Sequence, residues 1–148
     1  MLHTKIDARL SVAAQISVSD VADFAAAGFT LLINNRPDGE VEGQPEAAVI
    51  AAEARRCGLE FVDLPVVGGA ISEADVDAFD AALARAPGPV LAYCRSGTRS
   101  TMLWALAEVR RRPVDAVLAD CQRAGYDLDA LRPRLQALAG RAPPSTAG

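Results

Sequence analysis

The sequence has 148 residues, the size of one compact domain, and its 51% hydrophobic residues suffice for a sizeable core. Charged residues make up 23% of the chain and the net charge is -4, without the basic excess that nucleic-acid binding needs. No stretch is long and apolar enough to span a bilayer or to form a secretory signal. We therefore expect a soluble, cytoplasmic, single-domain protein over residues 1–141 with a disordered tail over 142–148, and neither a nucleic-acid nor a membrane partner.

Cysteine and histidine usage limits the available chemistry. Cys57, Cys94 and Cys121 are far apart and odd in number, which argues against a secreted disulfide framework. His3 is the only histidine, so the chain has almost no residues from which to build a zinc site or a catalytic cysteine–histidine pair. We expect no metal and no cofactor. Cys57 and Cys121 fall on the apolar stripes of predicted helices, which favours packing over chemistry for both.

Short apolar runs alternate with longer helical periodicities, which favours an α/β fold with a central, mostly parallel sheet flanked by helices. Strands are predicted near 13–16 and over 29–34, 59–66 and 90–93. Ser19 is the predicted cap of the first helix, Pro45 opens the second, and Ser72 with Asp75 forms the capped start of the third. The predicted inner faces are Val21, Phe24, Ala25; Val49, Ile50, Ala54, Cys57; Val76, Phe79, Leu83; Met102, Leu103, Leu106, Val109; Val114, Val117, Leu118, Cys121; and Leu128, Leu131, Leu135, Leu138.

The strand over residues 90–93 delivers Cys94 to the loop Arg95-Ser96-Gly97-Thr98-Arg99-Ser100. A loop between the carboxyl end of a strand and the amino end of a helix directs backbone N–H groups and the helix dipole to one point, which stabilises a thiolate there. A lone cysteine at a strand end is usually a small core residue. Two arginines, a glycine and three hydroxyls make a poor core and a good anion site, so we predict that Cys94 is a nucleophile.

Each loop residue has a candidate role in binding an anionic substrate. Gly97 permits a tight turn and close approach of a ligand, and Arg99 offers a planar fork that matches oxyanions. Ser100 is a candidate hydrogen-bond donor to the thiolate, and Arg95 is expected to point outward and recruit anions. The hydroxyls of the remaining loop residues are further candidate anion ligands: Ser96 and Thr98.

The segment from Tyr93 to Ser100 resembles the active-site loop of rhodanese-type sulfurtransferases and, more loosely, that of cysteine-dependent protein phosphatases. In those phosphatases the nucleophile and the anion-binding arginine are one residue further apart than Cys94 and Arg99, which four residues separate. The shorter spacing is rhodanese-like. The resemblance therefore implies a small cradle suited to a sulfane-sulfur donor such as thiosulfate or a persulfide.

A second resemblance covers residues from about 16 to 106. The segments 28–40, 64–66 and 92–100 together are similar to the phosphatase-like domain of beta-lactamase-hydrolase-like proteins. This family implies a fold like that of dual-specificity phosphatases. Its members occur alone or fused to metallo-beta-lactamase-like persulfide dioxygenases, which implies such a dioxygenase or another enzyme of sulfide oxidation as a partner.

Phosphatases of this type also supply an aspartic acid from the loop after the third predicted strand, to protonate the leaving oxygen. This chain has Val67-Gly68-Gly69-Ala70-Ile71 there, and the nearby Asp63 falls within the strand, where a surface carboxylate is expected. Asp38 and Glu40 are the alternative carboxylates, or else solvated turn residues. Arg36 is expected either to contact the Cys94 loop or substrate, or to form a salt bridge with Asp38.

These observations favour a sulfurtransferase in which Cys94 becomes a persulfide, Arg99 steadies the anionic donor, and the sulfur passes to a thiol or cyanide. A missing acid lowers the rate of ester cleavage by about 10² to 10⁴-fold, whereas departure of sulfite needs no proton. The alternative is a phosphatase in which Cys94 attacks phosphorus and Arg99 binds the transferred group. A third interpretation is a non-catalytic module that binds an anion or a persulfide.

Overall fold

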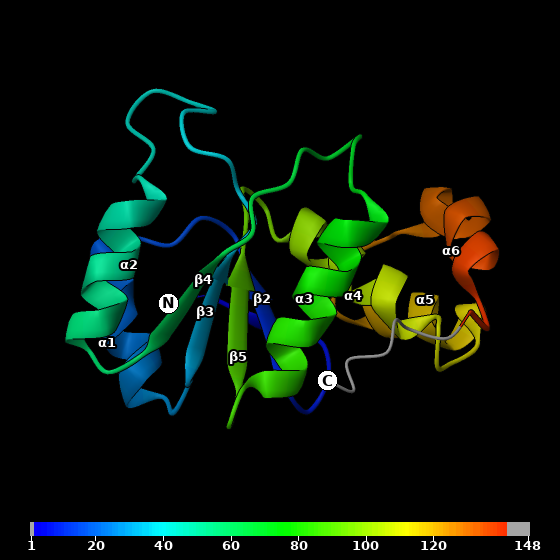
Figure 1. The fold of residues 1–148 in the computed structure, drawn as a ribbon, viewed down its shortest axis with the longest axis horizontal. Helices are drawn as coiled ribbons and strands as arrows, with labels where there is room; N and C mark the ends of the chain where they lie inside the picture. The colour runs from blue at the N-terminus through cyan, green and yellow to red at the C-terminus, as the bar shows by residue number, and fades with distance from the viewer. Residues whose placement is uncertain (1, 142–148) are drawn as a thin grey trace.

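The computed structural model describes residues 2–141, so the predicted disordered tail, residues 142–148, lies outside the described residues. A five-stranded sheet in the order β1-β2-β5-β3-β4 forms the centre of the fold (Figure 1). All pairings are parallel except that of β1 with β2. The predicted α/β class with a mostly parallel central sheet is confirmed. The strands are β1 (Thr4–Lys5), β2 (Leu10–Ala13), β3 (Leu31–Asn34), β4 (Glu60–Asp63) and β5 (Val90–Tyr93).

Helices cover both faces of the sheet (Figure 1). Two helices, α1 (Val18–Ala26) and α2 (Ala47–Arg56), pack on one face. The other face carries α3 (Glu73–Arg85) and α4 (Thr98–Glu108). Beyond α4 lie α5 (Val114–Arg123), the short 3₁₀ helix η1 (Asp129–Leu131) and α6 (Arg132–Leu138), and both α5 and α6 pack against α4 (Figure 1). Within residues 2–141, none of these helices combines the length and the apolar character that crossing a membrane requires.

The central strand β5 is buried on both sides. Leu91 and Tyr93 belong to the cluster under α1 and α2, whereas Val90 and Ala92 belong to the larger cluster under α3 to α6. This alternation explains the uninterrupted apolar run that predicted the strand, because a strand buried on both faces has no solvent-facing side. The predicted bounds of β5 are confirmed.

Two helices begin with a capping box, one of them as predicted. Ser72 and Asp75 exchange side-chain and backbone hydrogen bonds at the start of α3. In α1 the cap is Ser17, not the predicted Ser19, because Ser17 makes the reciprocal bonds with Asp20.

Two further expectations at the edges of elements were wrong. The first predicted strand, residues 13–16, lies instead at Leu10–Ala13, where it pairs with β5, and the short β1 before it was not predicted. Val49 is 49% exposed, because the inner face of α2 follows Ala47, Ile50, Ala51 and Ala54. Spacing of three and four residues along this helix leaves Val49 off the buried stripe.

The two cysteines expected to pack do so to different extents. Cys121 is fully buried on α5, and burial raises the pKa of its thiol to about 12. Cys57 is half-buried at the end of α2 and packs against the cluster under α1 and α2.

The carboxyl ends of three parallel strands bring their following loops to one edge of the sheet. Asn35 N–H donates to the carbonyl of Tyr93 at 2.8 Å, which joins the end of β3 to the end of β5. Val66 N–H in turn donates to the carbonyl of Asn35 at 3.0 Å, which joins β4 to the same edge. Ligands of open α/β sheets bind at such an edge. The three loops, residues 35–46, 64–72 and 94–97, therefore frame one candidate site.

Candidate active site

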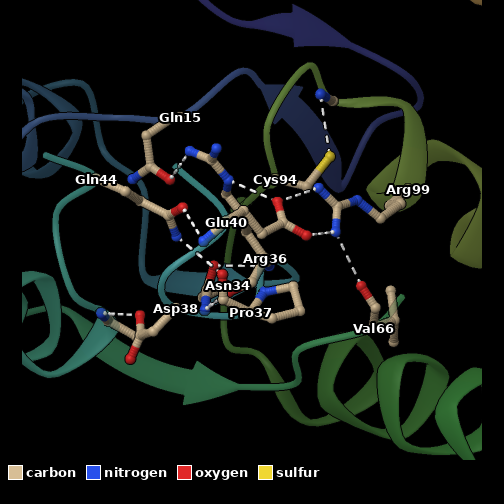
Figure 2. A network of polar contacts seen from close by, with 12 residues as sticks. Gln15, Asn34, Arg36, Pro37, Asp38, Glu40, Gln44, Val66, Cys94 and Arg99 are labelled. Atoms are coloured by element: carbon tan, nitrogen blue, oxygen red, sulfur yellow. Dashed lines mark hydrogen bonds and ion pairs between the residues drawn. The ribbon is translucent and has the colours of Figure 1, made fainter. Parts of the chain in front are cut away.

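The loop after β5 places a buried cysteine at the start of α4 (Figure 2). Cys94 is 0% exposed, and its Sγ accepts a hydrogen bond from the backbone N–H of Gly97 at 3.1 Å. Gly97 is the N-cap of α4 with a φ of 93°, in the left-handed region that glycine adopts without strain. The amino end of a helix directs unpaired N–H groups and partial positive charge to this point. The sulfur thus lies where an anion is stabilised.

Arg99 is held beside this sulfur by two other loops. Its Nη1 and Nη2 donate to both carboxylate oxygens of Glu40, at 2.7 and 2.8 Å, and Nη1 also donates to the carbonyl of Val66 at 3.0 Å (Figure 2). Glu40, and then the nearby Cys94, raise the pKa of the Arg99 guanidinium. The guanidinium still carries N–H groups that these three bonds do not use. Arg99 can therefore bind an anion without leaving this position.

Glu40 connects Arg99 with a second arginine. Arg36 is 4% exposed, and its Nε donates to Oε1 of Glu40 at 2.9 Å while Nη1 donates to Oε1 of Gln15 at 3.1 Å. Hydrogen bonds from Arg99 first, and from Arg36 second, lower the pKa of the Glu40 carboxyl to about 2. Glu40 lies exposed in the loop, as a turn residue would, and it is also an ionised bridge between two cations.

The other two candidate carboxylates bond to backbone and amide groups. Asp38 accepts the N–H of Ala47, the first residue of α2, at 2.8 Å, and Arg36 forms its salt bridge with Glu40 and not with Asp38. Asp63, at the end of β4, accepts from Nδ2 of Asn34 at 2.8 Å. Neither contact orients a carboxyl toward Cys94. Among residues 2–141 there is also no cluster of three or more side chains that could hold a metal ion.

The remaining loop residues are bound in ways that change one expected role. Ser100 is fully buried and donates its hydroxyl to Oδ1 of Asn35 at 2.8 Å, so its proton stabilises the neighbouring loop and not the thiolate. Ser96 donates its hydroxyl to that of Thr98 at 3.0 Å, on the outer side of the turn. Arg95 has an exposed side chain, in keeping with its expected outward orientation.

Four residues at this edge were not identified from the sequence or were given another role. Glu40 orients Arg99, Gln15 and Asn35 tie the surrounding loops together, and Tyr126 donates its hydroxyl to the carbonyl of Ser96 at 3.1 Å. Asn35 had a usable signal, because it directly follows a predicted parallel strand and so must lie near Cys94. Tyr126 follows α5, and nothing in its local sequence points to the site.

The sequence of this chain is similar to a known protein family. Residues 3–110 match the family described as beta-lactamase hydrolase-like protein, phosphatase-like domain. A beta-lactamase hydrolase-like protein of Xylella fastidiosa is 43% identical over 125 residues, which are 83% of this chain but only 29% of that protein. The chain thus spans less than a third of that curated relative.

Solved structures extend the likeness to the fold. A candidate phosphatase of Neisseria meningitidis superimposes with a TM-score of 0.83 at 36% identity, over 91% of this chain and 96% of that chain. Tk-PTP in its active form superimposes with a TM-score of 0.71 at 16% identity, over 94% of this chain and 97% of that chain. The predicted phosphatase-like family and fold are confirmed.

The expectation of a rhodanese-like sulfurtransferase was wrong. The matched family and both solved structures are phosphatase-like, whereas the expectation depended on the short spacing between Cys94 and Arg99. Backbone N–H groups at a helix N-terminus bind phosphate and other oxyanions alike, so one residue of spacing does not select the reaction.

Proposed function

The chain belongs to the phosphatase-like domain family of beta-lactamase hydrolase-like proteins, and from this premise we propose that it is a cysteine-dependent phosphatase with Cys94 as nucleophile. One observation carries the proposal. The Sγ of Cys94 lies at the amino end of α4, 3.1 Å from the N–H of Gly97, beside an arginine that Glu40 and Val66 hold in place. This arrangement combines a stabilised anionic nucleophile with a fixed cationic ligand for phosphate oxygens.

Substrate binding requires a local rearrangement. Cys94 is 0% exposed, so a phosphate group reaches its sulfur only after neighbouring side chains shift. Arg99 lies beside the sulfur, and its guanidinium attracts the incoming phosphate while it keeps its bonds to Glu40 and Val66. The phosphate oxygens would then be held by the free N–H groups of the loop and by the N–H groups of Arg99 that Glu40 does not use.

The reaction proceeds through two displacements at phosphorus. In the first, the Cys94 thiolate attacks phosphorus, an S–P bond forms, and the P–O bond to the leaving group breaks. In the second, a water oxygen attacks phosphorus and the S–P bond breaks, which releases inorganic phosphate and restores the thiolate. Arg99 and the loop N–H groups stabilise the charge on the equatorial oxygens in both steps.

Proton supply restricts the substrate. Glu40 is held ionised by two arginines, with a pKa of about 2, and residues 64–72 contain no carboxylate. The leaving oxygen therefore departs without a placed acid and takes its proton from solvent. This chemistry favours phosphate monoesters with weakly basic leaving groups, such as aryl phosphates.

Hydrolysis of p-nitrophenyl phosphate tests the proposal. Cys94→Ser should lower the rate by about 10³-fold or more, because the weakly acidic hydroxyl cannot replace the thiolate. Mass spectrometry of acid-quenched wild-type protein should find one phosphoryl group, on the Cys94 peptide. Cys57→Ser is the matched control, since Cys57 lies at the end of α2 outside the loop, and it should keep the wild-type rate. Full activity of Cys94→Ser would refute the proposal.

A further inference from the structure

Tyr126 reaches the Cys94 loop from the connection between α5 and η1, beyond the residues 3–110 that match the family. Its hydroxyl donates to the backbone carbonyl of Ser96 at 3.1 Å. The ring lies directly against the turn, because a Cβ atom at Gly97 would be only 2.2 Å from this hydroxyl. Glycine at position 97 therefore makes room for Tyr126 as well as for the turn.

The carbonyl of Ser96 and the N–H of Gly97 belong to one peptide group. On one side this peptide accepts the Tyr126 hydroxyl, and on the other its N–H donates to the Sγ of Cys94 at 3.1 Å. A hydrogen bond to the carbonyl of an amide polarises the group and strengthens its N–H as a donor, by about 10–30% per bond. The phenol, the peptide and the sulfur thus form a continuous chain of two hydrogen bonds.

The hydrogen bond from Tyr126 also orients the peptide group between Ser96 and Gly97. Gly97 has no side chain to limit rotation of the preceding peptide, and its φ of 93° is one of several conformations that glycine accepts. The bond from Tyr126 fixes the carbonyl outward, which keeps the N–H of the same peptide pointing at the sulfur. Burial first, and the nearby Cys94 second, raise the pKa of the Tyr126 hydroxyl, so the phenol keeps the proton that it donates.

We propose that Tyr126 is a positioning residue that stabilises the Cys94 thiolate through the peptide between Ser96 and Gly97. The catalytic meaning of this role rests on the proposed phosphatase function, but the effect on the sulfur does not. Tyr126 touches neither the reacting phosphorus nor, by any hydrogen bond, the sulfur itself. Its influence must therefore appear in the pH dependence of Cys94 reactivity.

Alkylation of Cys94 by iodoacetamide, followed across pH by peptide mass spectrometry, tests this role. Tyr126→Phe keeps the ring and removes only the hydroxyl. Its pH midpoint of alkylation should move upward by about 0.3–0.6 units, so that the rate below the midpoint falls about twofold to fourfold. The acidic limb of kcat/KM for p-nitrophenyl phosphate should move in the same direction.

Tyr93→Phe is the matched control. Tyr93 directly precedes Cys94 and is also buried, yet its hydroxyl has no hydrogen-bond partner among residues 2–141. Removing that hydroxyl should leave the alkylation midpoint unchanged. A shift of equal size in Tyr93→Phe would show that loss of any nearby phenol alters Cys94, and would overturn the proposal.

A second variant separates positioning from packing. Tyr126→3-fluorotyrosine retains the ring and makes the phenol a stronger donor, so the midpoint should move downward, opposite to Tyr126→Phe. Unchanged midpoints in both variants would overturn the proposal even if Tyr126→Phe lost activity or thermal stability, since only a structural contact would then remain. Wild-type protein without phosphatase activity but with the two opposite shifts would refute the proposed function and retain the role of Tyr126.

Discussion

Two loops at the carboxyl edge of the sheet meet at Arg99 and carry opposite chemistry. The loop that follows β5 surrounds Cys94 with backbone donors, hydroxyls and arginine. The loop that follows β4, residues 64–72, has no ionisable side chain and contributes the carbonyl of Val66 to Arg99. Gly68 of this loop lies next to the Arg99 side chain, because a Cβ atom added at Gly68 would be 3.9 Å from Arg99 Cδ. In the proposed mechanism the loop after β5 therefore supplies the groups that form and stabilise the S–P bond, and neither of these two loops supplies a group that protonates the leaving oxygen.

The largest expected effect of this contrast is a steep dependence on the leaving group. We expect kcat/KM for p-nitrophenyl phosphate to exceed that for an alkyl phosphate such as phosphoserine by about 10² to 10⁴-fold, because no placed acid assists the more basic alkoxide. A plot of log kcat/KM against leaving-group pKa for a series of substituted phenyl phosphates measures this dependence. A flat plot would mean that an unrecognised acid is at work.

Gly69→Asp supplies the carboxyl that the loop after β4 lacks. An added Cβ at Gly69 meets no atom within 4 Å, so the substitution fits without displacing a neighbour. The ratio of kcat/KM for aryl phosphates to kcat/KM for alkyl phosphates should become smaller in this variant. The matched variant Gly69→Asn introduces a side chain of the same shape without an acidic proton, and it should leave this ratio unchanged.

Removal of the bridge between the two arginines should have the next largest effect. Glu40→Gln loses the charge that holds Arg99 in two hydrogen bonds and leaves the buried Arg36 without its counter-ion. We expect kcat for p-nitrophenyl phosphate to fall about tenfold through the loss of orientation, with the slope against leaving-group pKa unchanged. A faster variant would show instead that Glu40 competes with substrate for Arg99.

The local part of the site could be predicted from the sequence. Cys94 and its turn lie on consecutive residues between β5 and α4, so strand burial and helix-end chemistry sufficed to locate them. The groups that orient them come from distant segments: Glu40 lies 59 residues from Arg99, and Tyr126 lies 30 residues from Ser96. Such pairs depend on how the loops pack at the sheet edge, which no periodicity encodes.

The wrong expectation of sulfur transfer also arose from contacts between distant segments. The spacing of Cys94 and Arg99 was compared as a linear distance, whereas the side chain of Arg99 takes its direction from Glu40 and Val66 on two other loops. The third predicted helix was correct because its capping box is complete within four consecutive residues, Ser72 to Asp75.

The capping box of α3 anchors the end of the uncharged loop after β4, residues 64–72. Ser72→Ala should lower the free energy of unfolding by about 1 kcal/mol, because the N–H of Asp75 loses its partner at the start of α3. Ser17→Ala removes the equivalent bond from α1 and should cost a similar amount. Urea unfolding measures both. If the loop after β4 serves the site only through Val66, kcat/KM should change less than twofold in either variant, and a larger loss confined to Ser72→Ala would assign that loop a wider role.

The smallest expected effect is a pH-dependent contribution of Glu40 to stability. Its folded-state pKa of about 2 lies below the ordinary value of 4.5, so the unfolded chain takes up a proton first as pH falls. The stabilisation is therefore complete above about pH 5 and disappears as pH falls toward 2. Because 27% of the Glu40 side chain is exposed, we expect about 1 kcal/mol or less. The free energies of unfolding of wild type and Glu40→Gln should thus converge in acid, and a difference that stayed constant down to pH 2 would mean that Glu40 acts through packing and not through its charge.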